Sequence, residues 1–175
     1  MTGNAGPSER IIGSLRLEDG EGIARMEDRF DASIDDVWSA LTEPRRLARW
    51  YGEVAGELRV GGEFHVRHAD GQRNGRVDAC EAPNHLLVTL RDPDAQPGQP
   101  EKIVNEVRLT ADGDQTVVGV ETRGLPPHLL AAYGVGAQIH VEHLADYVAG
   151  RESGDTEARW EELFPPYEAL AANAG

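Results

Sequence analysis

A change of hydrophobic period late in the chain is the feature that most constrains its fold. Between residues 127 and 150, apolar side chains recur every three or four positions over about five turns, the spacing of one face of an α-helix. The recurring residues are Leu130, Tyr133, Ala137, Val141, Leu144 and Val148. The segments before this helix alternate as strands do. An antiparallel sheet with helices on one face buries both patterns, so the sequence predicts an α+β fold.

Runs of alternating residues bounded by Gly, Pro, Asn or Asp predict the strands of that sheet. The predicted strands are residues 11–17, 23–30, 53–58, 63–68, 72–81, 85–91, 102–110 and 115–123. The first two flank Asp19 and Gly20, a dipeptide typical of hairpin turns. The later six form a meander, and a sheet curved around the long helix encloses space for a ligand.

Two short helices are predicted between the second and third strands. Ser33 is a suitable helix cap, with Asp36 three residues on. The apolar stripe that follows consists of Ile34, Val37, Trp38 and Leu41. Pro44 ends this helix and begins the next, which runs to residue 51. The apolar side of the second helix consists of Leu47, Trp50 and Tyr51, and its other side carries Arg45, Arg46 and Arg49, which we expect to be solvated.

Charge and composition exclude several classes of partner. The chain has 17 basic and 31 acidic residues and a formal charge of -14, which disfavours nucleic acid and anionic membranes. Only Lys102 among the basic residues is a lysine, a bias typical of GC-rich bacterial genomes. There is no apolar signal core and no run long enough to span a membrane, so we expect a cytoplasmic protein.

The chain is expected to form one domain with two appendages. Residues 1–9 are predicted to be a flexible tail, residues 10–151 the domain, and residues 152–175 a C-terminal extension. In the extension, Trp160, Leu163 and Phe164 form one face of a short helix, which Pro165 and Pro166 are expected to break. This apolar face must pack on the domain or on a partner, which leaves a homodimer as an alternative.

Several motifs in this order resemble the START-like (SRPBCC) superfamily, whose helix-grip fold is also called the polyketide cyclase or birch-pollen-allergen (START/Bet v-like) fold. They are "ASIDDVWSALTEPRRLARWYG", "LRVGGEFHV", "GRVDACEAPNHLLVTL" and the terminal helix, within residues 11–150. The chain is most similar to the AHSA-like family of homologues of the activator of the heat-shock protein ninety ATPase. The resemblance implies a curved antiparallel β-sheet wrapped around a long C-terminal α-helix, with two short helices after the first strand region.

The resemblance also assigns structural roles to particular residues. Val37 and Trp38 match core anchors, and Trp50 matches the end of the second helix. Gly61 and Gly62 match a backbone kink before a strand, where positive φ or close packing excludes a side chain. Gln138 stands where the family commonly has tryptophan, so the ligand preference of the family is not carried over to this chain.

Candidate ligand-binding residues come from the faces that should meet between helix and sheet. They are Trp50, Phe64, Val66, His68, Tyr133, Ala137, His140 and Leu144. Helical spacing places His140 on the face expected to cover the sheet, either as a satisfied core histidine or as a polar contact to a ligand. Arg76 and Asp78 alternate with Val77, so they point either into a charged pocket or, as we favour, into solvent.

No pattern of catalytic, metal-binding or cofactor-binding residues is found. His65 and His68 fall on opposite faces of a strand, and the spacing of His140 and His143 matches no known zinc motif. Cys80 has no activating base visible in the sequence. There is no nucleophile elbow, phosphate loop or complete dinucleotide fingerprint. We therefore expect no catalytic residue, metal or cofactor.

Three functions remain open from the sequence. The favoured one is binding of a small hydrophobic or amphipathic ligand in a closed cavity between the long helix and the sheet. The second is a co-chaperone-like interaction, disfavoured because the chain has no second domain of suitable size. The third is a cyclase or hydrolase-type enzyme, since the superfamily includes both and one fold hosts many functions.

Overall fold

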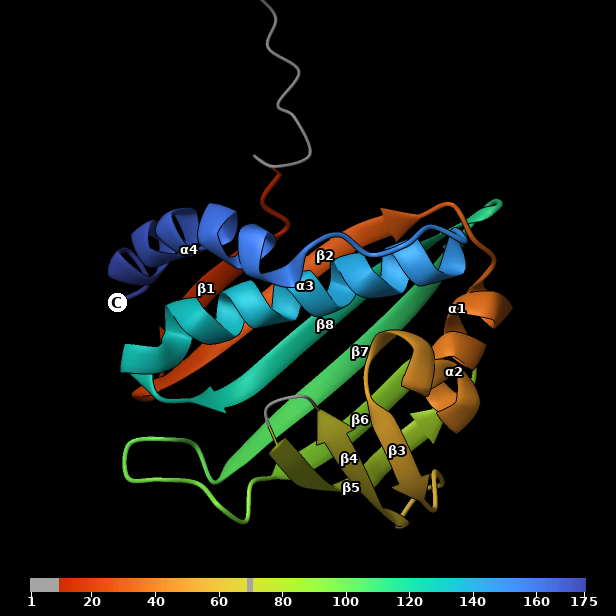
Figure 1. Cartoon of the computed structure of the whole chain (residues 1–175), viewed down its shortest axis with the longest axis horizontal. Coiled ribbons are helices and arrows are strands. Elements are labelled where there is room, and N and C mark those ends of the chain that lie inside the picture. The colour runs from red at the N-terminus through yellow and green to blue at the C-terminus, as the bar shows by residue number, and fades with distance from the viewer. Residues whose placement is uncertain (1–9, 69–70) are drawn as a thin grey trace, which may run out of the picture.

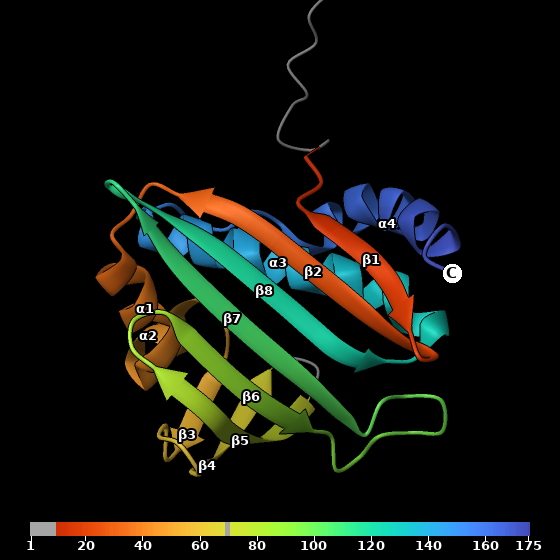
Figure 2. The same cartoon turned by 180° about the vertical axis from the view of Figure 1, so that it is seen from behind.

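The computed structural model describes residues 10–68 and 71–175, and in this part of the chain the strands form one antiparallel sheet in the order β1-β2-β8-β7-β6-β5-β4-β3 (Figures 1 and 2). The strands are β1 (Gly13–Glu18), β2 (Glu21–Phe30), β3 (Glu53–Gly56), β4 (Glu63–His68), β5 (Gly71–Glu81), β6 (His85–Arg91), β7 (Lys102–Asp112) and β8 (Gln115–Leu125). The predicted meander is confirmed, and pairing of β2 with β8 joins the first hairpin to it. The predicted tail, residues 1–9, lies outside the described residues.

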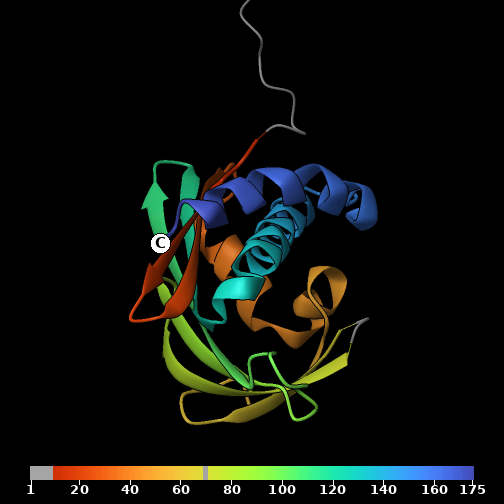
Figure 3. The ribbon, with the colours of Figure 1, turned by 90° about the vertical axis from the view of Figure 1, so that its left-hand side faces the viewer.

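The helices lie on one face of this sheet. They are α1 (Ile34–Thr42), α2 (Pro44–Trp50), the short 3₁₀ helix η2 (Pro127–Leu129), α3 (Leu130–Val148) and α4 (Thr156–Ala172). Figure 3 shows the sheet curving around α3, with α4 on the side of α3 near β1. This is the helix-grip arrangement, and the predicted α+β fold class is confirmed. No helix in the described ranges is long and apolar enough to cross a membrane.

Local sequence explains where these helices begin. The Ser33 hydroxyl accepts a hydrogen bond from the backbone N–H of Asp36 at 3.3 Å, as expected for a helix cap. Pro44 occupies the first turn of α2, where its missing N–H costs no hydrogen bond. The carboxylate of Asp155 caps α4 by accepting from the N–H groups of Glu157 and Ala158.

The main core lies between the sheet and the pair α3 and α4. Its fully buried members include Met26 of β2, Val135 of α3, and Leu163 and Tyr167 of α4. A second cluster, formed by Phe64, Val66, Val77 and Leu90, lies on the same face of the sheet beneath β3 to β6. Helix α4 is therefore part of the core, since it covers the side of α3 that β2 and β8 leave open.

The expected break at Pro165 and Pro166 is wrong, because α4 continues through both prolines to Ala172. The reason is tertiary packing. Leu163 and Tyr167 are four residues apart, lie on the same side of the helix and are both fully buried in the main core. Their burial maintains the helix direction across the two residues that lack a backbone donor.

The predicted kink at Gly61 and Gly62 has the expected physical basis. Gly61 has a φ of +80°, which disfavours a side chain. A Cβ at Gly62 would lie 2.4 Å from the carbonyl oxygen of Glu57, closer than atoms can pack. Both glycines are therefore needed for the chain to turn from β3 into β4.

Candidate functional site

An apolar surface on the inner face of β6 and β7 is only partly covered by the helices. Leu86, Val88 and Ile103 point to the α3 side of the sheet, yet they are half-buried, whereas Leu109, further along the same face of β7, is buried. We define the inner patch as Leu86, Val88, Ile103, Asn105 and Thr122, which share this face of β6, β7 and β8. Solvent can still reach its three apolar members and Asn105, whereas Thr122 is buried.

Two polar side chains lie within the inner patch. The hydroxyl of Thr122 donates to Oδ1 of Asn105 at 2.7 Å. This bond uses the oxygen of the Asn105 amide and fixes the orientation of the group. The amide nitrogen carries two N–H donors, and no acceptor for them is found in the described part of the chain. The patch therefore combines apolar contact area with one directed donor group, the composition typical of small-molecule sites.

Three aromatic rings meet beside this surface and bridge α2, β4 and α3. The ring of Tyr51 contacts His68 edge-on at 4.8 Å between centroids and His140 at 5.2 Å. The rings of His68 and His140 are stacked at 6.1 Å. The sequence predicts both histidines as ligand contacts, whereas it places Tyr51 only on the apolar side of the second short helix.

Phe64 and Val66 point to the α3 side of the sheet, as the alternation predicted, and both are buried in the second core cluster. The Phe64 ring lies directly over Gly75, where a Cβ would come within 2.2 Å of it. Phe64 and Val66 therefore stabilise the sheet beside the inner patch and contribute little to the surface of the patch itself.

The four candidate residues of α3 occupy different environments. Leu144 is buried in the main core, Tyr133 and Ala137 are half-buried against it, and His140 is exposed. The expectation that His140 shares the covered face is therefore wrong. The helix buries a wider arc than one stripe because both the sheet and α4 pack against it, and this arc excludes His140.

Trp50 is half-buried against the main core and connects the two short helices. Its indole N–H donates to the carbonyl oxygen of Ala40 at 2.9 Å, so its polar atom is already used within the protein. Its ring contacts Tyr51 at 5.3 Å between centroids. Trp50 thus positions Tyr51, which in turn reaches the two histidines.

Gln138 lies on the opposite side of α3 from His140 and is fully buried. Its Oε1 accepts from the Tyr167 hydroxyl at 2.5 Å and from the N–H of Ile12 at 3.2 Å. Its Nε2 donates to the carbonyl oxygen of Arg10 at 2.7 Å. Gln138 therefore connects α4 and the N-terminal segment to α3, away from the inner patch.

Arg46 corrects the expectation of a fully solvated arginine rim. Its guanidinium donates to the Tyr147 hydroxyl at 3.0 Å, lies 5.1 Å from the Tyr147 ring centroid, and pairs with Asp36 at 2.9 Å. The hydrogen bond to Tyr147 raises the pKa of Arg46, with Asp36 contributing. Arg46 fastens α2 to α1 and α3, whereas Arg45 and Arg49 are exposed as expected.

The remaining candidates of the sequence analysis fall outside the inner patch. Arg76 and Asp78 both point outward, as expected for residues two apart on one strand, and they pair at 3.2 Å. Cys80 is half-buried, and burial raises the pKa of its thiol. Among residues 10–68 and 71–175, no three histidine, cysteine or carboxylate side chains are grouped to hold a metal.

Comparison with known proteins agrees with this architecture. The model of one protein family, described as Activator of Hsp90 ATPase homolog 1-like protein, matches residues 31–149. No match was found among curated proteins.

Solved structures with the same fold include CalU16 from Micromonospora echinospora, with a TM-score of 0.74, 28% identity and coverage of 91% of this chain and 96% of that one. DynU16, from the dynemicin biosynthetic locus, has a TM-score of 0.68 and 26% identity, covering 79% of this chain and 51% of that chain. A conserved protein of unknown function from Enterococcus faecalis, 18% identical, shows the fold alone, with a TM-score of 0.69 and coverage of 90% and 91%.

Proposed function

This chain belongs to the family of Activator of Hsp90 ATPase homolog 1-like proteins, and from that premise we propose that it binds a small apolar or amphipathic molecule between α3 and the sheet. The observation that carries the proposal is the inner patch. Inward-facing side chains of a sheet are normally buried, yet Leu86, Val88 and Ile103 keep access to solvent beside the Asn105 amide. A ligand would cover this apolar area.

The chemistry of the patch defines the class of ligand. Its apolar side chains favour an uncharged hydrocarbon or aromatic body, and the free N–H groups of Asn105 favour one hydrogen-bond acceptor, such as a carbonyl or ether oxygen. The proposed wall on the helix is Tyr133 and Ala137, and the proposed mouth is the ring cluster of Tyr51, His68 and His140. The likeness to DynU16, a protein of a biosynthetic locus, supports a biosynthetic small molecule.

We propose binding rather than turnover for a chemical reason. The polar groups of the inner patch are an amide and a hydroxyl, and neither gains or loses a proton readily near neutral pH. The two imidazoles of the site, those of His68 and His140, lie at the proposed mouth and stack on each other. Trp50, Phe64, Val66 and Leu144, proposed from sequence as ligand contacts, would act by supporting the walls, since they pack against the two core clusters.

The test uses the neutral, apolar fluorophore 1-N-phenylnaphthylamine as the probe. Ile103→Phe and Val88→Phe should each fill the space above the inner patch and weaken dye binding by about tenfold, equivalent to about 1.4 kcal/mol. Val104→Phe is the matched control, because Val104 lies on the outer face of the same strand as Ile103. Thermal unfolding of all three variants checks that they are folded.

Native mass spectrometry of the purified protein adds a second readout, since a retained ligand would appear as added mass that Ile103→Phe removes. Absence of saturable dye binding by the unmodified protein, or equal weakening by Val104→Phe and Ile103→Phe, would contradict the proposal.

A further inference from the structure

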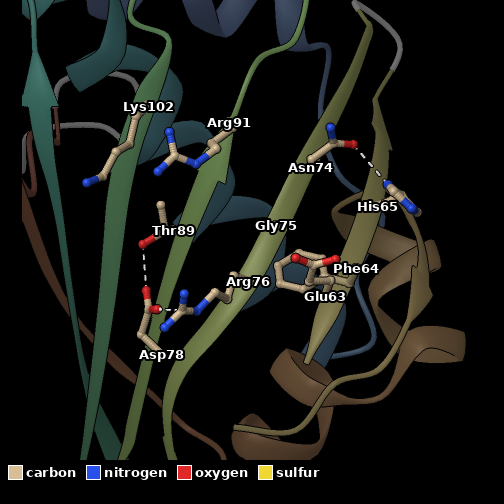
Figure 4. Close-up of a pocket in the computed structure, with 10 residues that line it drawn as sticks. All are labelled: Glu63, Phe64, His65, Asn74, Gly75, Arg76, Asp78, Thr89, Arg91 and Lys102. Carbon is tan, nitrogen blue, oxygen red and sulfur yellow. Dashed lines mark hydrogen bonds and ion pairs between the residues drawn. The ribbon is translucent and has the colours of Figure 1, made fainter. Parts of the chain in front are cut away.

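A hollow of about 470 Å³ lies on the outer face of the sheet, across β4 to β7 and on the side away from α3 (Figure 4). Its lining is polar and is rich in nitrogen-bearing side chains, in a chain whose formal charge is -14. We define the outer row as His65, Asn74, Arg91 and Lys102, which are consecutive register partners across these four strands. This row contains no carboxylate.

Two cations of the outer row face each other without neutralisation. Arg91 and Lys102 are direct cross-strand partners, and both are exposed. Like charges placed directly opposite on a sheet destabilise it. Within the described ranges, neither side chain forms an ion pair or a hydrogen bond. The adjacent Asp92 is directed instead to Arg73, at 3.6 Å.

Of the two acidic groups in the hollow, Asp78 is committed to another cation. Asp78 accepts from the Thr89 hydroxyl at 2.5 Å and pairs with Arg76 at 3.2 Å. Glu63 is the register partner of Arg76 on the other side. The lining of the hollow thus has three cations, Arg76, Arg91 and Lys102, against the two carboxylates of Glu63 and Asp78, which leaves a net positive charge beside Arg91 and Lys102.

Asn74 is oriented as a further donor beside Arg91. Its Oδ1 lies 2.9 Å from Nδ1 of His65, and because an amide oxygen only accepts, the histidine nitrogen must donate. The amide nitrogen of Asn74 therefore keeps its N–H groups for another partner. Figure 4 shows it on the opposite side of the amide from His65.

We propose that the outer row is a binding site for a small molecule carrying a diphosphate or two neighbouring oxyanions. Adjacent strands are about 4.8 Å apart, so Asn74, Arg91 and Lys102 present donors at intervals that match neighbouring oxyanion groups. A long polyanion is disfavoured, because beyond the row it would meet the excess acidic charge of the chain. This site is on the opposite face of the sheet from the inner patch and does not depend on it.

The test is a titration with inorganic diphosphate, followed by amide NMR spectra at low ionic strength. Saturable shifts are expected at the Asn74 side chain and at the backbone of residues 91 and 102, with weaker binding of inorganic phosphate. Replacing both cations, in Arg91→Gln with Lys102→Gln, should raise the Kd for diphosphate by at least about tenfold. The matched control is Arg45→Gln with Arg49→Gln, which removes the same charge from exposed positions on α2 and should change the Kd less than about twofold.

A stability measurement without added anion separates binding from a structural role. If the two cations serve to bind an anion, they repel each other when no anion is bound. The Arg91→Gln, Lys102→Gln protein should then melt at the same temperature as the unmodified protein or at a higher one. Absence of saturable shifts at the row, or equal weakening by both double variants, would overturn the proposal. A lower melting temperature for the Arg91, Lys102 variant than for its control would also overturn it.

Discussion

The hydroxyl of Tyr167 in α4 donates a hydrogen bond to Oε1 of Gln138 in α3 at 2.5 Å, and both side chains are fully buried. Burial raises the pKa of Tyr167, so the phenol remains a donor over the physiological range. This contact joins the C-terminal extension to the helix around which the sheet curves.

Removing the Tyr167 hydroxyl should therefore destabilise the fold. Tyr167→Phe is expected to lower the free energy of unfolding by about 1 to 2 kcal/mol, because the buried Gln138 oxygen loses its shortest donor. Urea unfolding followed by circular dichroism measures this change. In a Gln138→Leu background the same substitution should cost less, since the hydroxyl has lost its shortest hydrogen bond and keeps only the contacts with Met26 and the backbone of Gly13. Equal costs in both backgrounds would show that the pair is not coupled.

Gly75 should not tolerate a methyl group. Its Cβ would lie within 2.2 Å of the Phe64 ring, so Gly75→Ala is expected to cost about 1 to 3 kcal/mol through overpacking. Gly136→Ala is the matched control, because no atom lies within 4 Å of the added Cβ and alanine favours a helix interior by about 0.5 to 1 kcal/mol. The two variants should shift the melting temperature in opposite directions. A neutral Gly75→Ala would mean that Phe64 has room to move.

Glu106 should stabilise the protein only while it is ionised. It accepts from His85 Nε2 at 2.7 Å and from Arg123 and Arg108 at 3.2 Å each. The hydrogen bond with His85, followed by the one with Arg123, lowers the pKa of Glu106 below its ordinary value of 4.5. A carboxyl whose pKa is lower in the folded state contributes stability above pH 4.5, and this contribution is lost as the pH falls through the folded-state pKa.

Glu106→Gln is thus expected to lower the free energy of unfolding at pH 7 by up to about 1 kcal/mol, as for partly exposed ion pairs. The difference from the unmodified protein should shrink below about pH 4 and vanish on further acidification. Denaturant unfolding at several pH values measures it. Glu152→Gln, at an exposed position, serves as the control and should show no such dependence. A deficit that is constant from pH 7 to pH 3 would contradict the assignment.

The thiol of Cys80 should react slowly in the folded protein. Burial raises its pKa and so lowers the fraction of thiolate, the reactive form, at any given pH. At pH 8, we expect modification by 5,5′-dithiobis(2-nitrobenzoic acid) to be about tenfold slower than in denaturant. Equal rates in the two conditions would indicate that the strand opens readily at Cys80.

The order and type of the elements could be read from the sequence because they depend on local patterns. The Ser33 cap, the proline that begins α2, and the strand periods all act over a few residues, and each is found where it was predicted. The resemblance to the family added the curvature of the sheet around α3, which no local pattern contains. The continuation of α4 through Pro165 and Pro166 was missed, because a proline's local cost is visible in sequence and the packing of Tyr167 is not.

The candidate sites depended much more on tertiary structure. The sequence by itself determined that α3 is amphipathic and that Phe64 and Val66 share a face of β4. Only the tertiary structure decided that α4 covers a second side of α3, which buries Gln138 and leaves His140 exposed. His140 lies two residues after Gln138, a little over half a helical turn around α3. The tertiary structure also decided that Asn105 meets Thr122, and Arg91 meets Lys102, because strand register pairs residues that are 11 or more positions apart in the chain. Periodicity shows which face of an element is apolar, whereas the partner that covers that face is selected by packing across the whole molecule.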